Sequence, residues 1–322
     1  MRPSPLRTGR PGSWRRYRGP LTGLVVGSLV LAACGSSPSG HGATSSDGMI
    51  RVVAAENEYG NVAAQVGGRY VSVTSVESNP NTDPHSYEVS PGVAEALSSA
   101  QVVIQNGVGY DAFMTKIESA SPSPMRHVID VQNLLGLPDS TPNPHLWYSP
   151  KTMPAVAHAL AADFAIVQPD HGAYFKTEAA TFITSLDPWL AAIAAFKATY
   201  PGTAVATTEP VADYMLEAAG TDNLTPFGLQ ADIMNGVDPS PQDVTLQTGL
   251  FTGHRVKVFV YNEQVTDALT QSFITAARKA GVPIVGVYET MPVPGYDYQS
   301  WMLAEVRALD RAVADRTSTV RL

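Results

Sequence analysis

Cysteine is nearly absent from the sequence, since Cys34 is the only one among 322 residues. A single cysteine cannot form an internal disulfide, so the fold has to depend on the packing of apolar side chains. The chain is 44% hydrophobic, which is ample for two domains of ordinary size. The composition therefore predicts a globular chain of two domains without an internal disulfide.

A long apolar run of the kind that spans a bilayer is also lacking at the N-terminus. The run from Leu21 to Ala33 is shorter than the about 20 apolar residues that a transmembrane helix needs. Six arginines precede it without a single acidic residue. A basic segment followed by a short apolar run and small residues is the layout of a secretory signal peptide. We therefore predict that residues 1–33 are an export signal.

Residues 31–34 read Leu-Ala-Ala-Cys, which resembles the lipobox cut by the lipoprotein signal peptidase. Cys34 then lies at the predicted cleavage site, where it would carry lipid chains. More than one lipid chain gives a stable membrane tether. A chance cysteine after an ordinary signal peptide is the alternative. Residues 34–49 are rich in Gly and Ser, which predicts a flexible tether on the outer face of the cell membrane.

Basic residues are scarce once the signal peptide is set aside. The remaining chain has 15 Lys and Arg against 29 Asp and Glu, a net charge near −14. This balance argues against nucleic acid as a partner, because phosphate binding needs neutralising positive charge. It is compatible with the attraction of small cations, although an acidic balance more often serves solubility.

Strand patterns alternate with helix patterns from residue 50 onward. In the first part, apolar or alternating segments predict strands at 50–54, 71–76 and 102–104, and helix signals cover 56–66, 90–100, 111–119 and 153–167. Strands and helices that alternate at this spacing are typical of a mostly parallel sheet covered on both faces. Ligands of such sheets bind at the strand ends.

The most regular periodicity predicts a long helix over 172–199, kinked at Pro188 because proline removes a backbone hydrogen bond. Its apolar stripe, spaced by fours and threes, consists of Phe175, Ala179, Phe182, Leu186, Trp189, Ile193 and Phe196. The alternation of strands and helices then resumes. The sequence therefore predicts an α/β fold of two lobes, each a mostly parallel β-sheet flanked by helices, at 50–170 and 200–322. One long helix at 171–199 bridges them.

Only two of the seven histidines, His85 and His145, follow a proline and stand two positions before an aromatic residue. Proline stiffens the backbone on both sides of the peptide bond, so each imidazole projects from a rigid corner. Two such corners can form half of a metal site. For the other histidines, His41, His127, His158, His171 and His254, a structural or solvated role is the better interpretation.

Two carboxylates in the second lobe have matching positions. Glu209 follows the predicted strand at 203–207, and Glu289 follows the predicted strand at 283–287. A single glutamate after a strand is more often a solvated loop residue. The combination of two acids and two histidines, all at strand exits of two lobes, instead predicts a shared metal site.

Across nearly all of residues 50–315 the sequence resembles the solute-binding lipoproteins of bacterial ABC importers for manganese, zinc or iron, the cluster A-I group. The resemblance rests on Ala55-Glu56-Asn57-Glu58-Tyr59-Gly60, Asp83-Pro84-His85-Ser86-Tyr87-Glu88, Asn106-Gly107-Val108-Gly109-Tyr110 and Asn143-Pro144-His145-Leu146-Trp147-Tyr148-Ser149-Pro150. It continues in Glu209, Tyr214 and the segment from Tyr298 to Leu309. It implies a protein that captures a divalent cation outside the membrane and hands it to a permease with its ATPase.

The resemblance also implies the ligands. The first two family histidines fall on His85 and His145, and the third position, histidine in many zinc binders, holds Glu209. The fourth is usually aspartate but here holds Glu289, with Asp297 as a nearby alternative. Two nitrogens with two carboxylates that can bind through both oxygens favour Mn²⁺ or Fe²⁺ over tetrahedral Zn²⁺. Zinc nevertheless outcompetes manganese at most such sites, so all three remain candidates for the cargo.

Two other functions could use the same residues, a secreted metal-dependent hydrolase and a surface adhesin. No His-Glu-x-x-His motif occurs, and four protein ligands leave no open position for an activated water. We therefore expect a monomeric, lipid-anchored binding protein that is not an enzyme. An adhesin role would not exclude this function.

Overall fold

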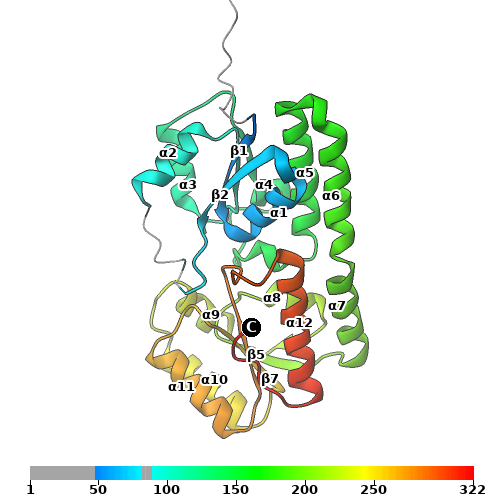
Figure 1. The fold of residues 1–322 in the computed structure, drawn as a ribbon. Helices are drawn as coiled ribbons and strands as arrows, with labels where there is room; N and C mark the ends of the chain where they lie inside the picture. The colour runs from blue at the N-terminus through cyan, green and yellow to red at the C-terminus, as the bar shows by residue number, and fades with distance from the viewer. Residues whose placement is uncertain (1–47, 82–83, 85–88) are drawn as a thin grey trace, which may run out of the picture. The chain divides into compact units, whose positions relative to one another are not determined.

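The computed structural model describes residues 48–81, 84 and 89–322 of the chain. In this part of the chain, two four-stranded parallel sheets are joined by a long helical segment (Figure 1). The strand order is β2-β1-β3-β4 in the first sheet and β6-β5-β7-β8 in the second, so the two lobes share one topology. The predicted fold class is confirmed.

The first lobe is a sheet with helices on both faces. Its strands are β1 (Ile50–Glu56), β2 (Val71–Glu77), β3 (Val102–Gln105) and β4 (His127–Asp130). Its helices are α1 (Asn57–Gly67), α2 (Pro91–Ser99), α3 (Ala112–Ala120), α4 (Val131–Leu134) and α5 (Thr152–Val167), with 3₁₀ turns η1 (Gly68–Tyr70), η3 (Leu146–Tyr148) and η4 (Pro169–His171). Val52 and Ala54 pack in the core that contains α1 and α5, whereas Val53 and Ala55 pack with α2 and α3. A strand buried on both faces needs such a continuous apolar run.

The linking segment consists of α6 (Gly172–Ser185) and α7 (Asp187–Thr199). Pro188 occupies the first turn of α7, where its missing N–H costs least. The predicted apolar stripe is buried along its whole length, and it joins the core cluster that continues into both lobes. Residues 169–199 are long and apolar enough to cross a membrane, but this packing assigns their apolar side to the protein core.

The second lobe repeats the first with different helices. Its strands are β5 (Ala204–Thr207), β6 (Asp222–Asn223), β7 (Val258–Asn262) and β8 (Ile284–Val287). Its helices are α8 (Asp213–Ala218), α9 (Phe227–Met234), α10 (Pro241–Thr252), α11 (Ala268–Lys279) and α12 (Tyr298–Ala314). The sequence interpretation contained neither β6 nor α9. The strands predicted at 203–207 and 283–287 correspond to β5 and β8.

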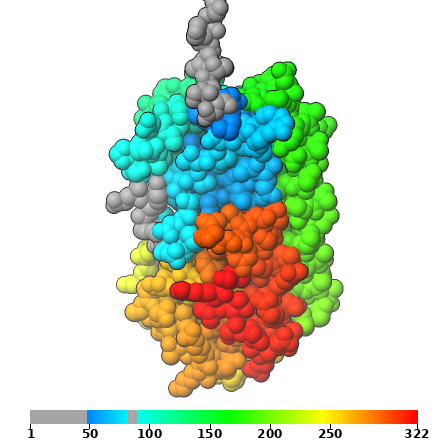
Figure 2. Space-filling view, in the orientation of Figure 1, coloured from blue at the N-terminus to red at the C-terminus, as the bar shows by residue number. Residues whose placement is uncertain are grey.

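The two lobes also contact each other directly, beside the linking helices. The side chain of Asn57 in α1 donates to the carbonyl of Met291 at 2.9 Å and accepts from its backbone N–H at 3.0 Å. Gln65 and Gln299 exchange amide hydrogen bonds across the same boundary. In Figure 2 the orange segment after β8 lies against the blue surface of the first lobe. These contacts hold the lobes together independently of α6 and α7.

Candidate metal centre

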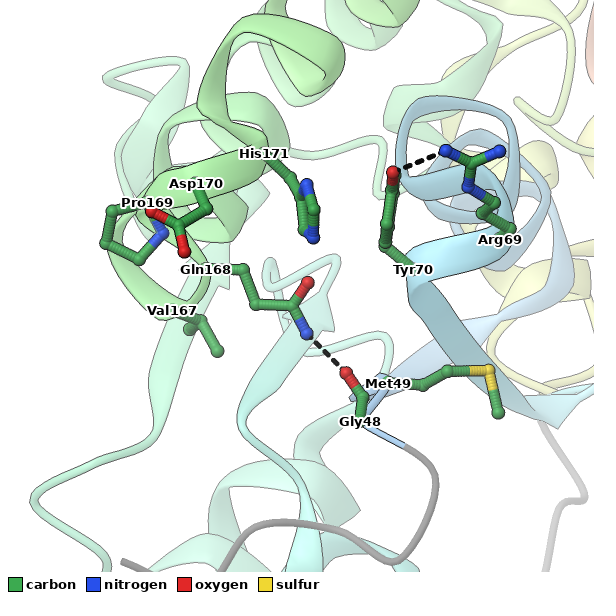
Figure 3. Close-up of a pocket in the computed structure, with 9 residues that line it drawn as sticks. All are labelled: Gly48, Met49, Arg69, Tyr70, Val167, Gln168, Pro169, Asp170 and His171. Carbon is green, nitrogen blue, oxygen red and sulfur yellow. Dashed lines mark hydrogen bonds between the residues drawn. The ribbon is translucent and has the colours of Figure 1, made fainter.

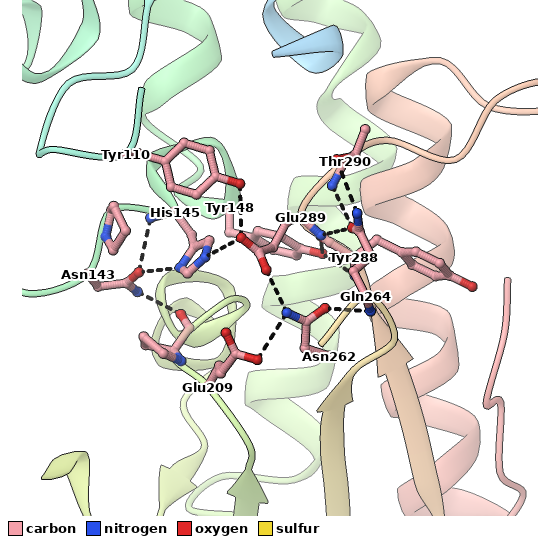
Figure 4. Close-up of polar contacts among 12 residues, drawn as sticks. Tyr110, Asn143, His145, Tyr148, Glu209, Asn262, Gln264, Tyr288, Glu289 and Thr290 are labelled. Carbon is pink, nitrogen blue, oxygen red and sulfur yellow. Dashed lines mark hydrogen bonds and ion pairs between the residues drawn. The ribbon is translucent and has the colours of Figure 1, made fainter. Parts of the chain in front are cut away.

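The candidate site lies where the carboxyl ends of the second sheet meet the first lobe (Figure 4). Glu209 follows β5 by two residues, Asn262 is the last residue of β7, and Glu289 follows β8 by two residues. The three strands are neighbours in the order β5-β7-β8. Because parallel strands end at one edge, their exit residues converge there.

His145 comes from the first lobe and is fully buried. The side-chain amide of Asn143 donates to the carbonyl of Pro210 at 2.7 Å, which fixes its oxygen as an acceptor. That oxygen lies 2.8 Å from His145 Nδ1 and 3.0 Å from the His145 backbone nitrogen. Since an amide oxygen can only accept, Nδ1 carries a proton, and Nε2 is the nitrogen that faces the site.

Aromatic rings cover the sides of this imidazole. The ring of Trp147 lies edge-on to His145 with centroids 5.4 Å apart, and the ring of Tyr110 lies at 5.8 Å. Tyr110 and Trp147 contact each other as well. The imidazole therefore has little freedom to rotate, and its coordinating nitrogen keeps one direction.

Glu289 connects the two lobes through its carboxylate. Its Oε2 lies 3.1 Å from His145 Nε2 and accepts a hydrogen bond from the Tyr110 hydroxyl at 2.9 Å. Its Oε1 accepts from the amide of Asn262 at 2.6 Å. The Glu289 backbone N–H donates to the side-chain oxygen of Gln264. The position of the Glu289 carboxylate is therefore fixed from three sides.

Glu209 completes the cluster that the described part of the chain contributes. It is 3% exposed, and its Oε1 accepts from the amide of Asn262 at 3.1 Å. The structure thus brings together His145, Glu209 and Glu289, which the sequence placed far apart. Coordination of a metal by these residues stays a prediction.

The other predicted site residues differ in their outcome. His85 and Cys34 lie outside the described residues. Asp297 accepts a hydrogen bond from the backbone N–H of Ser300 and caps α12, so its carboxylate has a structural partner away from the cluster. Among residues that the structure describes, no three His, Cys, Asp or Glu side chains meet the geometry for holding an ion by themselves.

Sequence reasoning missed the polar residues that position the ligand candidates, Tyr110, Asn143, Asn262 and Gln264. Tyr110 and Asn143 belong to segments that carried the resemblance, so their presence in those motifs was a usable signal. Asn262 stands at the end of β7, much as the two glutamates stand at the ends of their own strands. A search for polar residues at every strand exit would have found it.

Residues 52–312 match the family described as ZnuA, zinc-uptake complex component A, periplasmic. The chain belongs to this family. The sequence-based resemblance to metal solute-binding proteins is thereby confirmed.

Two curated relatives are both manganese-binding lipoproteins MntA. The protein of Bacillus subtilis is 26% identical over 181 residues, which cover 53% of this chain and 58% of the relative. That of Halalkalibacterium halodurans is 26% identical over 166 residues, which cover 51% of this chain and 54% of the relative. The match therefore spans little more than half the length of these relatives.

Solved structures share the fold at lower identity. A crystal structure of ZnuA is 19% identical with a TM-score of 0.67, covering 83% of this chain and 100% of that chain. The Mn-bound periplasmic metal-binding protein from Candidatus Liberibacter asiaticus is 18% identical, with a TM-score of 0.67 and coverage of 81% and 98%. The SBP FpvC of P. aeruginosa in complex with Ni²⁺ is 19% identical, with a TM-score of 0.67 and coverage of 85% and 100%. These likenesses support the two-lobed fold of the ZnuA family.

A second group of acids in this ZnuA-family chain is also buried. Burial, and then the charges of Asp111, Glu77 and Glu58, raise the pKa of Glu56 well above its usual range. Burial likewise raises the pKa of Glu58 well above its usual range. Among the residues that the structure describes, none makes a hydrogen bond of standard geometry with the four side-chain oxygens of Glu56 and Glu58. Burial therefore favours the neutral form of these two carboxyl groups.

One further cavity lies at the other end of the first lobe, with a volume of about 490 Å³ (Figure 3). The imidazole of His171 stacks on the ring of Tyr70 at its wall, with centroids 3.9 Å apart. The guanidinium of Arg69 lies over the same ring. His171 therefore packs within the first lobe, as the sequence interpretation expected, and the cavity is lined by none of the predicted ligands.

Proposed function

We propose that this chain is the substrate-binding lipoprotein of a metal ABC importer. It captures one divalent cation, Mn²⁺, Zn²⁺ or Fe²⁺, outside the membrane and delivers it to the permease and its ATPase. Membership of the zinc-uptake family and the similarity to manganese-binding lipoproteins support this proposal. The observation that carries it is the convergence of His145 and Glu289 from opposite lobes, with Glu209 beside them in a buried position.

The site suits a small, doubly charged cation. His145 Nε2 supplies a nitrogen lone pair when it is deprotonated, and the two carboxylates supply oxygens with opposite charge to the ion. Burial of these groups excludes water and strengthens their attraction to a cation. We assign His85 as the fourth ligand. Binding without turnover is the activity of this site.

The first residues serve attachment in this proposal. Residues 1–33 are the signal peptide, Cys34 carries the lipid, and residues 34–49 connect it to the lobes at 50–170 and 200–322, joined by the helix at 171–199. The Cys34→Ala variant should move from the membrane fraction to the soluble fraction of the host cell. Membrane association that persists in this variant would contradict lipid anchoring while leaving the metal site untouched.

Loss of one imidazole tests the metal site. The His145→Ala variant should lose more than about 100-fold in affinity, because removing mere hydrogen-bond partners of metal ligands already costs about 10–100-fold. The measurement is a chelator competition with Mn²⁺, Zn²⁺ and Fe²⁺ on the full chain in detergent. The control is His171→Ala, which removes an imidazole far from the site and should bind as the wild type does. Stoichiometric, high-affinity binding by His145→Ala would refute the proposed function.

A further inference from the structure

Asn262 is the residue through which the two site carboxylates meet. Its amide nitrogen donates to Glu209 Oε1 at 3.1 Å and to Glu289 Oε1 at 2.6 Å. An amide nitrogen has two hydrogens, so each carboxylate receives one of them. Asn262 is 1% exposed, and water therefore does not compete for these bonds.

The orientation of this amide is fixed by its surroundings. The Asn262 side-chain oxygen accepts from the backbone N–H of Gln264 at 3.0 Å, which excludes the flipped orientation. The Asn262 backbone N–H donates to the hydroxyl of Thr208 at 3.0 Å. The side-chain oxygen of Gln264 in turn accepts from the backbone N–H groups of Glu289 and Thr290. The amide and the loop that carries Glu289 are thus held as one unit.

These bonds give the two carboxylate oxygens of Glu289 different partners. Oε1 is directed to Asn262, whereas Oε2 faces His145 Nε2 and the Tyr110 hydroxyl. A cation that binds His145 Nε2 therefore meets Oε2 first. Binding through both oxygens would require the carboxylate to turn both of them toward the cation, and the bond from the rigid, buried amide to Oε1 opposes that rotation. The same holds for Oε1 of Glu209.

We infer that Asn262 is a positioning residue that limits Glu209 and Glu289 to one coordinating oxygen each and so sets the selectivity of the site. This inference rests on the proposed function. Glu209 and Glu289 then offer two oxygens in place of the up to four that two bidentate carboxylates would give. Fewer donor atoms suit tetrahedral Zn²⁺, whereas Mn²⁺ gains from additional oxygen ligands. Removal of the amide should therefore shift the preference toward Mn²⁺.

The Asn262→Leu variant tests this directly, because leucine has a similar volume and no donor. Affinities for Zn²⁺ and for Mn²⁺ are measured separately by chelator competition on the full chain in detergent. The ratio of Zn²⁺ to Mn²⁺ affinity should fall about tenfold, on the scale of outer-sphere changes at metal sites. The matched control is Asn106→Leu, since Asn106 is buried and donates to the carbonyl of Pro144 at 2.8 Å rather than to a carboxylate. It should weaken both ions alike and leave the ratio unchanged.

X-ray absorption of the Zn²⁺-loaded wild type supplies a measurement that needs no variant. The inference expects each carboxylate to be bound through one oxygen. Five or six ligands with a carboxylate bound through both oxygens would overturn it, as would an unchanged affinity ratio in Asn262→Leu. A wild type that binds neither ion would contradict the proposed function itself, and the two failures are therefore distinguishable.

Discussion

The two lobes have the same sheet topology but use their strand exits differently. In both sheets the first strand pairs in parallel with the third, and the register is fixed by Val52 opposite Val102 and by Val205 opposite Val258. Four residues beyond these pairs the chain has Glu56 with Asn106 in the first lobe and Glu209 with Asn262 in the second. The same two residue types thus occupy equivalent positions in both lobes.

Of the two described pairs, only the one in the second lobe has a hydrogen bond from the asparagine to the glutamate. Asn262 donates to Glu209 and Glu289, whereas Asn106 donates to the carbonyl of Pro144 and accepts from the hydroxyl of Tyr59 at 2.7 Å. Within the described part of the chain, the side-chain oxygens of Glu56 have no hydrogen-bond partner of standard geometry, and burial raises the pKa of Glu56 well above the usual range.

The difference shows what keeps a buried carboxylate available to a cation. A buried acid without donors is neutralised, because an unpaired charge in the interior is costly. Donors that stabilise the anion oppose this, and in the second lobe Asn262 donates to both site glutamates, Glu209 and Glu289. The first lobe instead uses its asparagine to hold the loop before His145. One lobe therefore positions an imidazole, and the other positions carboxylates.

Substitution of the two equivalent acids, Glu209 and Glu56, should give the largest difference between the lobes. The Glu209→Gln variant should lose more than about 100-fold in affinity for the divalent cation, since it loses a charged ligand and not merely one of its partners. The equivalent change Glu56→Gln should leave the affinity nearly unchanged. Chelator competition on both variants measures the contrast. Equal losses in the two variants would mean that Glu56 also belongs to the site.

A smaller effect is expected on the stability of the protein, through the buried acids of the first lobe. Glu56 and Glu58 have pKa values raised above 4.5 by burial, so the native state retains protons that the unfolded chain releases as the pH rises. Wild-type stability should therefore fall as the pH rises above 4.5. The double variant Glu56→Gln, Glu58→Gln cannot ionise, so at pH 7.5 it should gain stability relative to the wild type, by about 1.4 kcal/mol for each unit by which burial raises a native pKa.

Denaturant unfolding at about pH 4 and about pH 7.5, on either side of the ordinary glutamate pKa, measures this difference. The advantage of the double variant should largely disappear at the lower pH, where both acids are mostly protonated in the native and the unfolded state. An advantage that is the same at both pH values would show that packing, and not proton binding, separates the two chains.

The fold was largely predictable because its signals are local. Alternating strand and helix patterns located most elements, and the stripe from Phe175 to Phe196 identified the linking segment. The short strand β6 was missed because Asp222 and Asn223 are polar and extend only by pairing with β5. The helix α9 was missed although its sequence is compatible with a helix.

Candidate ligands were predictable by residue type and by position relative to a strand, but their partners were not. His145, Glu209 and Glu289 each follow a local signal in the sequence, and the structure brings them together. Glu289 and Asp297 could not be separated from the sequence, because both are acids in the same loop region. In the structure Asp297 caps α12, whereas Glu289 contacts His145 across the lobes.

The sequence alone determined the two α/β lobes, the linking helix and the family, because periodicity and motifs are properties of neighbouring residues. Only the tertiary structure decided how the ligand candidates are oriented. The bonds from Asn262 to Glu209 and Glu289 cross 53 and 27 residues of sequence. The contact of His145 with Glu289 crosses 144 residues. No local pattern encodes such distances, since they follow from the register of parallel strands and from the packing of one lobe on the other.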